Sequence, residues 1–176
     1  MDQLWAPWRM ELISKGERGE LPKTCIFCEL PRARADRETL VLGRTASAFA
    51  ILNKFPYNNG HLMVVPRRHV AELHQLDAAE YGELAEMLRV AVRLVGKAYA
   101  PQGANVGMNL GRIAGAGIAD HLHWHVVPRW SGDTNFMPVI ADTKVMIEHL
   151  HASWDKLRPL FDQEFRYGDQ GAVESW

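Results

Sequence analysis

The chain has 176 residues, of which 47% are hydrophobic and 23% charged, and its formal net charge is −1. These values are typical of one globular domain, so we expect a single domain over residues 1–176, with a core at about 4–160 and a polar tail at about 163–176. A nearly neutral chain is poorly suited to general nucleic-acid binding. No apolar run approaches the roughly 18 residues that span a bilayer, and the N-terminus lacks a signal peptide's apolar segment. We therefore expect a cytoplasmic protein without a membrane partner.

Turn residues and apolar patterning divide the chain into elements. Glycine, proline and charged residues predict loops at 14–23 and 31–38. Apolar runs predict strands at 39–42, 47–52, 61–65, 105–110 and 120–129. Helical spacing predicts a long helix at 77–99 and a second helix at 144–158 that Pro159 ends. This order predicts an α+β fold: a mostly antiparallel five-stranded sheet with one long helix and a C-terminal helix.

The long helix has the clearest local signals. Asp77 and Glu80 have the spacing of a capping box, in which each side chain accepts a hydrogen bond from the other residue's backbone. Apolar residues then recur at helical spacing, at Leu84, Leu88, Ala91, Val92, Val95 and Tyr99. This stripe is typical of a core-facing or subunit-facing helix.

Two cysteines lie close together in Cys25-Ile26-Phe27-Cys28. They could form a redox pair, although no thioredoxin-like strand-helix-strand pattern surrounds them. They could also be two buried thiols that behave as small apolar side chains. A third interpretation is half of a tetrahedral zinc site, which needs two further ligands. His69 and His121 are available in the chain for that purpose.

Three of the eight histidines alternate with apolar residues in Asp120–Arg129. In a strand, alternate side chains share a face, so His121, His123 and His125 would point one way. Leu122, Trp124 and Val126 would pack the other way into the core. Pro128 cannot donate to a sheet ladder and would end the strand or place it at an edge. A row of imidazoles offers nucleophiles, proton donors or metal ligands near neutral pH.

The run His-Leu-His-Trp-His-Val-Val resembles the signature of the histidine triad superfamily of nucleotidyl hydrolases and transferases. The similarity covers roughly residues 4–145. The segments 4–10, 53–63 and 126–136 most resemble the bacterial diadenosine polyphosphate phosphorylases and their hydrolase relatives. The resemblance implies an α+β sheet that usually pairs into a homodimer.

The resemblance also implies roles for individual residues. In zinc-bearing branches the ligands correspond to Cys25, Cys28, His69 and His121, which form a closed, structural Zn²⁺ site. His123 corresponds to the nucleophile, and His125 to a hydrogen-bond donor that contacts the phosphate. The nucleotide-binding positions correspond to Asn53, Asn109, Gly115, Gly117, His125 and Arg129.

Some of these positions have simpler interpretations. Gly111–Gly117 could be only a flexible connection, and Ala116-Gly117-Ile118 lacks the amide and hydroxyl that the family usually carries there. Asn53 could be a turn residue before Lys54-Phe55-Pro56 rather than a ribose ligand. Arg129 could pair with a surface carboxylate instead of an anion.

The activity that the resemblance implies is cleavage of diadenosine polyphosphates through a nucleotidyl-histidine, with phosphorolysis of diadenosine tetraphosphate as the preferred reaction. The alternatives are asymmetric hydrolysis, a nucleotide-binding protein that does not turn over, and a metal-binding regulatory protein. The scheme needs no catalytic divalent metal, although the substrate could arrive with Mg²⁺.

Overall fold

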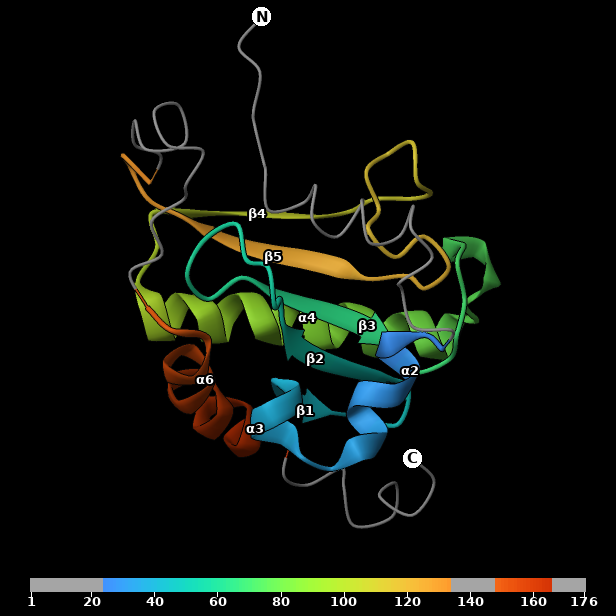
Figure 1. Ribbon diagram of the computed structural model, residues 1–176, viewed down its shortest axis with the longest axis horizontal. Coiled ribbons are helices and arrows are strands. Elements are labelled where there is room, and N and C mark those ends of the chain that lie inside the picture. Colours follow the sequence, from blue (N-terminus) through green and yellow to red (C-terminus); the bar gives the residue numbers. More distant parts are fainter. Residues whose placement is uncertain (1–23, 134–147, 166–176) are drawn as a thin grey trace, which may run out of the picture.

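A computed structural model describes residues 24–133 and 148–165. Five strands form one sheet in the order β1-β2-β3-β5-β4, and every neighbouring pair is antiparallel (Figure 1). The strands are β1 (Val41–Arg44), β2 (Ala48–Leu52), β3 (Leu62–Pro66), β4 (Gly103–Met108) and β5 (Trp124–Arg129). The predicted α+β fold with a five-stranded antiparallel sheet is confirmed.

Helices pack against the sheet, including its edge strand β1. The α-helices are α2 (Ile26–Glu29), α3 (Asp36–Thr39), α4 (Ala78–Tyr99) and α6 (Leu150–Phe165), and the 3₁₀ turns are η1 (Leu30–Ala33) and η2 (Leu73–Gln75). The long helix α4 runs across the sheet, and α6 packs against α4 and β1 (Figure 1). No helix in the described parts of the chain is long and apolar enough to cross a membrane.

The hydrophobic core lies between α4 and the central strands. The side chains of β2 and β3 are buried throughout, and α4 contributes Leu84, Met87, Val90, Ala91, Leu94 and Val95. The predicted capping box is present, because Glu80 N–H donates to Asp77 Oδ1 at 2.8 Å and Asp77 N–H donates to Glu80 Oε2 at 3.0 Å. The predicted bounds of this helix, 77–99, therefore differ from the observed bounds by one residue.

Two local predictions were wrong. Residues 31–38 contain η1 and most of α3 rather than a loop. Helix α6 begins at Leu150 and continues through Pro159 to Phe165. Leu157 and Phe161 flank Pro159 and are fully buried, so their packing offsets the roughly 3 kcal/mol that an internal proline costs a helix. Residues 144–147 of the predicted helix and segment 4–10 lie outside the described residues.

The histidine-rich stretch is only partly a strand. Strand β5 begins at Trp124, so His121 and His123 lie in the segment that leads into it, and both are buried. Leu122 N–H donates to the carbonyl of Val70 at 2.7 Å, which holds this segment against the chain after β3. Pro128 lies inside β5, beyond the last residue that pairs with β3, so its missing N–H leaves that pairing intact.

Candidate functional site

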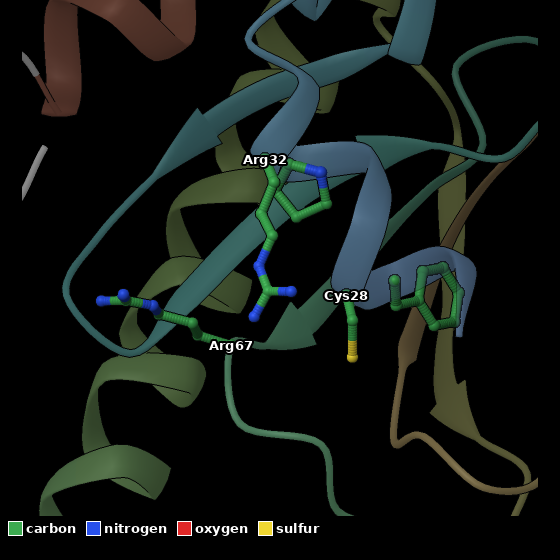
Figure 2. A pocket seen from close by; sticks show the side chains of 5 residues that line it. Cys28, Arg32 and Arg67 are labelled. Atoms are coloured by element: carbon green, nitrogen blue, oxygen red, sulfur yellow. The ribbon is translucent and has the colours of Figure 1, made fainter. Parts of the chain in front are cut away.

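A small cavity lies beside α2, and Phe27, Cys28, Pro31, Arg32 and Arg67 line it (Figure 2). Its volume is about 70 Å³, whereas sites for cofactor-sized or drug-sized ligands have about 300–1,000 Å³. This cavity is therefore too small for a nucleotide. The histidines and cysteines next to it are more informative.

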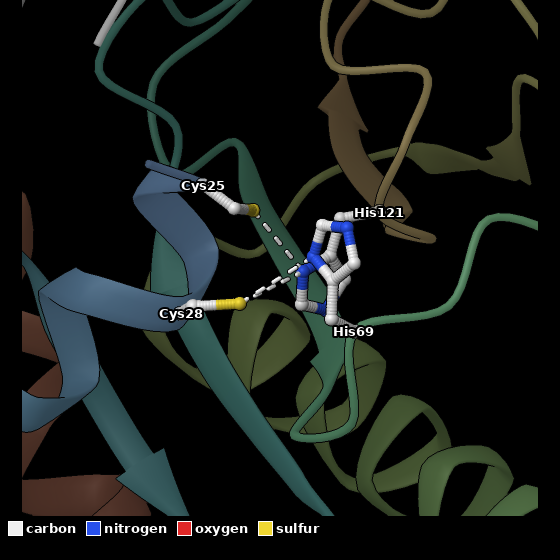
Figure 3. A group of neighbouring side chains, drawn as sticks. All are labelled: Cys25, Cys28, His69 and His121. Carbon is white, nitrogen blue, oxygen red and sulfur yellow. Dashed lines mark hydrogen bonds between the residues drawn. The ribbon is translucent and has the colours of Figure 1, made fainter. Parts of the chain in front are cut away.

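Cys25, Cys28, His69 and His121 come together from three parts of the chain (Figure 3). Cys25 immediately precedes α2 and Cys28 lies within it, while His69 follows β3 and His121 precedes β5. One ligand atom from each residue lies within 4.8 Å of the others. The predicted set of four is thus assembled by the fold.

The distances within this cluster fit a tetrahedral metal ion. Cys25 Sγ lies 3.3 Å from His121 Nδ1, and Cys28 Sγ lies 3.5 Å from His69 Nδ1 and 3.7 Å from His121 Nδ1. Zinc bonds of the usual length to sulfur and nitrogen separate two tetrahedral ligands by about 3.6 Å. His121 Nε2–H donates to the Pro66 carbonyl at 2.8 Å, so Nδ1 keeps its lone pair for a metal.

Burial shifts the pKa of two members of this cluster. Burial lowers the pKa of His121 to about 4, so its ring is neutral at neutral pH, as a metal ligand must be. Burial, followed by the nearby charge of Cys25, raises the pKa of Cys28 to about 11. A cation between the two sulfurs would reverse that effect by favouring both thiolates.

His123 is held in one orientation by a backbone carbonyl. Its Nδ1 lies 2.8 Å from the carbonyl oxygen of His121, and a carbonyl can only accept, so Nδ1 carries the proton. Nε2 of the neutral ring therefore keeps its lone pair. His123 is 5% exposed. A fixed, neutral imidazole with a lone pair on Nε2 has the form required of a nucleophile.

A second chain of hydrogen bonds fixes His125. The backbone N–H of Tyr57 donates to His61 Nδ1 at 3.0 Å, so the proton of neutral His61 is on Nε2. That proton points to His125 Nδ1, also at 3.0 Å, which leaves the proton of neutral His125 on Nε2. The ring centroids of His123 and His125 are 5.0 Å apart in an edge-to-face arrangement, so a ring with a lone pair on Nε2 neighbours a ring with a proton on Nε2.

The predicted nucleotide positions other than His125 and Arg129 lie in loops that follow strands. Asn53 follows β2, and its Oδ1 accepts a hydrogen bond from Phe55 N–H at 2.9 Å. This contact matches the turn-forming role that the sequence offers as the alternative to ribose binding. Asn109 Nδ2 donates to the carbonyl of Gly115 at 3.4 Å. Gly115 has φ +93°, a left-handed conformation that favours glycine. Gly117 is exposed in the same loop.

Arg129 already has protein partners. It forms an ion pair with Asp133 and donates to Asn105 Oδ1 at 2.8 Å. The hydrogen bond from Arg129 is the main cause that holds the pKa of Asp133 well below its usual range. In β5, Arg129 shares a face with His125 about 13 Å away, four residues along the strand. It therefore lies at the far end of the strand from His123.

Known proteins share this sequence and this fold. A family model described as HIT domain matches residues 34–132. The chain belongs to the HIT, or histidine triad, family. It is 42% identical over 151 residues to an AP-4-A phosphorylase of Mycobacterium tuberculosis, a match that covers 83% of this chain and 77% of the relative. An adenosine 5′-monophosphoramidase of Schizosaccharomyces pombe is 34% identical over 60% of this chain and 74% of its own.

A solved HIT structure has the same fold. The zinc-bound histidine triad family protein of Mycobacterium smegmatis aligns with a TM-score of 0.63 over 80% of this chain and 95% of its own, at 23% identity. The two sheets and their helices are thus arranged alike. At this identity the likeness concerns the fold alone.

Within this HIT domain, sequence reasoning missed His61. The apolar pattern predicts His61 only as the first residue of a strand. In the structure it immediately precedes β3, and its side chain is fully buried. A buried imidazole needs hydrogen-bond partners. A histidine at the start of an apolar run such as Leu62–Val65 therefore indicates a buried polar contact. The partner could not be identified without the pairing of β3 with β5.

Proposed function

We propose that this HIT protein is an enzyme that cleaves diadenosine tetraphosphate by phosphorolysis, giving ATP and ADP. The observation that carries the proposal is the paired presentation of His123 and His125. One ring offers a lone pair on Nε2, and the other offers an N–H proton next to it. The 42% identical relative named AP-4-A phosphorylase supports the choice of substrate and of acceptor.

The first step is attack of His123 Nε2 on an α-phosphorus of the substrate. A nitrogen–phosphorus bond forms, the bond from that phosphorus to the bridging oxygen breaks, and ATP leaves. His125 Nε2–H donates a hydrogen bond to the phosphate oxygens as their charge changes. The His121 carbonyl accepts from Nδ1–H while the His123 ring becomes positively charged. The adenylyl group is then bound to His123.

The second step transfers the adenylyl group to inorganic phosphate. A phosphate oxygen attacks the adenylyl phosphorus, the nitrogen–phosphorus bond breaks, and ADP leaves with His123 neutral again. Asn53 is proposed to bind ribose, because an amide offers both a donor and an acceptor to a diol. Asn109, Gly115 and Gly117 are proposed to lie beside the phosphates, and Arg129 to attract an anion at the far end of β5. Mg²⁺ enters this scheme only with the substrate.

We infer that the Cys25, Cys28, His69 and His121 cluster holds one structural zinc ion. The tetrahedral fit, the proton of His121 on Nε2 and the mixed sulfur–nitrogen donors support zinc over hard cations, which prefer oxygen. Four protein ligands leave no open position, so the ion would supply folding energy rather than chemistry. We also propose a cytoplasmic location, where thiols stay reduced.

A homodimer is the assembly we propose. Among the described residues only β5 pairs with β4, which leaves the other edge of β4 open to a second copy. Val106, Leu110 and Ile113 expose apolar side chains on and after this strand. A free strand edge next to apolar surface favours pairing with another chain. Light scattering at micromolar concentration should give twice the chain mass, and a monomer mass would contradict the proposal.

The decisive experiment separates the nucleotide products after incubation with diadenosine tetraphosphate, with and without inorganic phosphate. Phosphorolysis gives ATP and ADP and requires phosphate. Asymmetric hydrolysis gives ATP and AMP, and symmetric hydrolysis gives two ADP, in both cases without phosphate. ATP and AMP formed at a rate that ignores phosphate would replace the phosphorylase with a hydrolase. Tight binding with no products would favour a nucleotide-binding protein.

A further inference from the structure

The ring of Phe27 contacts both the nucleophile and a residue of the metal cluster. Its centroid lies 5.2 Å from that of His123, with the planes tilted by 48°. It also lies 5.6 Å from the ring of His121 in an edge-to-face arrangement. Phe27 is 2% exposed, so this contact is shielded from water. The His123 ring thus has Phe27 as one neighbour and His125, at 5.0 Å, as another.

This enclosure bears on which nitrogen of His123 can attack. The lone pair stays on Nε2 only while Nδ1–H points at the His121 carbonyl. The χ2 angle of a histidine side chain has a broad distribution, so the ring turns easily. A neutral imidazole can also carry its proton on either nitrogen. With more room the ring could turn away from the carbonyl, and water could compete for Nδ1–H. Phe27 fills part of the space into which the ring would turn.

We propose that Phe27 is a positioning residue that keeps His123 in its attacking orientation and tautomer. Phe27 lies between Cys25 and Cys28 in the sequence, and both cysteines belong to the cluster with His121. The contacts of both cysteines with His121 therefore hold Phe27 and the His121 carbonyl in one local arrangement. This inference rests on the proposed function only where it treats His123 as the nucleophile.

The same contact also acts on the charge that develops during the reaction. When Nε2 bonds to phosphorus and Nδ1 keeps its proton, the ring carries a positive charge. An aromatic ring within about 6 Å of a cation attracts it. Loss of Phe27 therefore lowers kcat, because it affects the attack, and leaves KM unchanged, because Phe27 does not contact the substrate in this scheme.

The test uses the full chain saturated with zinc, with metal content matched between samples. Phe27→Leu and Phe27→Met both remove the ring and keep most of the apolar volume. Phe161→Leu is the matched control, because Phe161 is also buried but lies in α6, which packs against α4 and β1. Ring nitrogen NMR of labelled histidine reports the tautomer of His123, assigned by comparison with His123→Asn. Steady-state kinetics report kcat and KM.

We expect a single Nδ1–H tautomer in the wild type and in Phe161→Leu. Both Phe27 variants should show mixed tautomers and a fall in kcat of about 10- to 100-fold at unchanged KM, as misplaced reacting groups usually cause. One tautomer in both Phe27 variants, an unchanged kcat, or an equal loss of kcat in Phe161→Leu overturns the inference. If the wild type does not cleave diadenosine tetraphosphate, the proposed function fails, whereas the ring spectra still decide whether Phe27 sets the tautomer.

Discussion

Backbone groups determine where three imidazoles in this site, those of His61, His121 and His123, carry their protons. A carbonyl accepts from His121, another accepts from His123, and a backbone N–H donates to His61. The His61 proton in turn sets that of His125. Spacing in the sequence identified the three alternating histidines, but the direction of each hydrogen bond depends on chain segments that only the fold brings together.

Substitution of the two histidines proposed to react, His123 and His125, should separate binding from chemistry. His123→Asn should bind the nucleotide without turnover, because it removes the attacking nitrogen and keeps a polar side chain. His125→Asn should lower kcat by roughly 10²- to 10³-fold, as expected for loss of one transition-state donor. Single-turnover kinetics and calorimetric titration of a nucleotide measure the two effects.

His151→Asn is the control for these substitutions, because His151 lies in α6. It should leave kcat unchanged. Full activity in His123→Asn would exclude His123 as the nucleophile, whatever the acceptor.

At the scale of elements, strong local signals predicted most of the fold. The five strands and α4 follow from apolar periodicity and the capping box, which depend on neighbouring residues. The ends of α6 did not follow, because Pro159 ends helices unless tertiary packing outweighs its cost, as Leu157 and Phe161 show. Similarly, α3 depends on Asp36, which pairs with Arg44 and Arg158 from β1 and α6.

The loop before β3 depends on a glycine that has no room for a side chain. Gly60 has φ +75°, and a Cβ there would lie 2.6 Å from the ring of Tyr99 in α4. Gly60→Ala should lower the free energy of unfolding by about 1–3 kcal/mol through backbone strain. It should also lower kcat, because the next residue is His61.

The control for this substitution is Gly82→Ala, in the second turn of α4, where a Cβ would meet nothing within 4 Å. It should raise stability by about 0.5–1 kcal/mol through helix propensity. Urea unfolding measures both variants, and equal changes in the two would contradict the conformational constraint at Gly60.

The ion pairs of Asp36 predict a pH dependence. Burial raises the pKa of Asp36, but hydrogen bonds and charge from Arg44 and Arg158 outweigh it and hold the pKa below its ordinary 3.8. The stabilisation is therefore present above pH 3.8 and is lost as the pH falls below that value. Asp36→Asn should cost about 1–3 kcal/mol at pH 7, and the difference from the wild type should shrink in acid.

Asp155→Asn is the matched control for Asp36→Asn. Asp155 pairs with Arg37 at an exposed position, where solvent screens the interaction. Unfolding followed between pH 7 and pH 3 should show a much smaller effect for this variant. Equal effects would mean that Asp36 does not link α3, β1 and α6 as described.

At the scale of the molecule, the proposed zinc joins α2 to the sheet. Cys25→Ser with Cys28→Ser should remove the ion found by elemental analysis and lower the melting temperature, because metal binding contributes folding energy. His74→Asn changes an exposed histidine outside the cluster and should alter neither. Unchanged metal content in the double variant would mean that no such site exists.

The pairing of β3 with β5 has a consequence for how the protein acquires activity. Only three residue pairs align these strands, whereas the hairpins on either side, β1-β2-β3 and β4-β5, are local in sequence. Three contacts join the two parts of the sheet that meet at β3 and β5. They are those of His61 with His125, of Pro66 with His121 and of Asn58 with Pro128. Long-range pairing of this kind is entropically costly and forms late in folding. Divided near Pro101, the C-terminal half would hold both His123 and His125, whereas the N-terminal half would hold His61 and three of the four residues of the metal cluster. Activity would arise only on reassembly of the two pieces, which makes it a direct reporter of the last long-range step in folding.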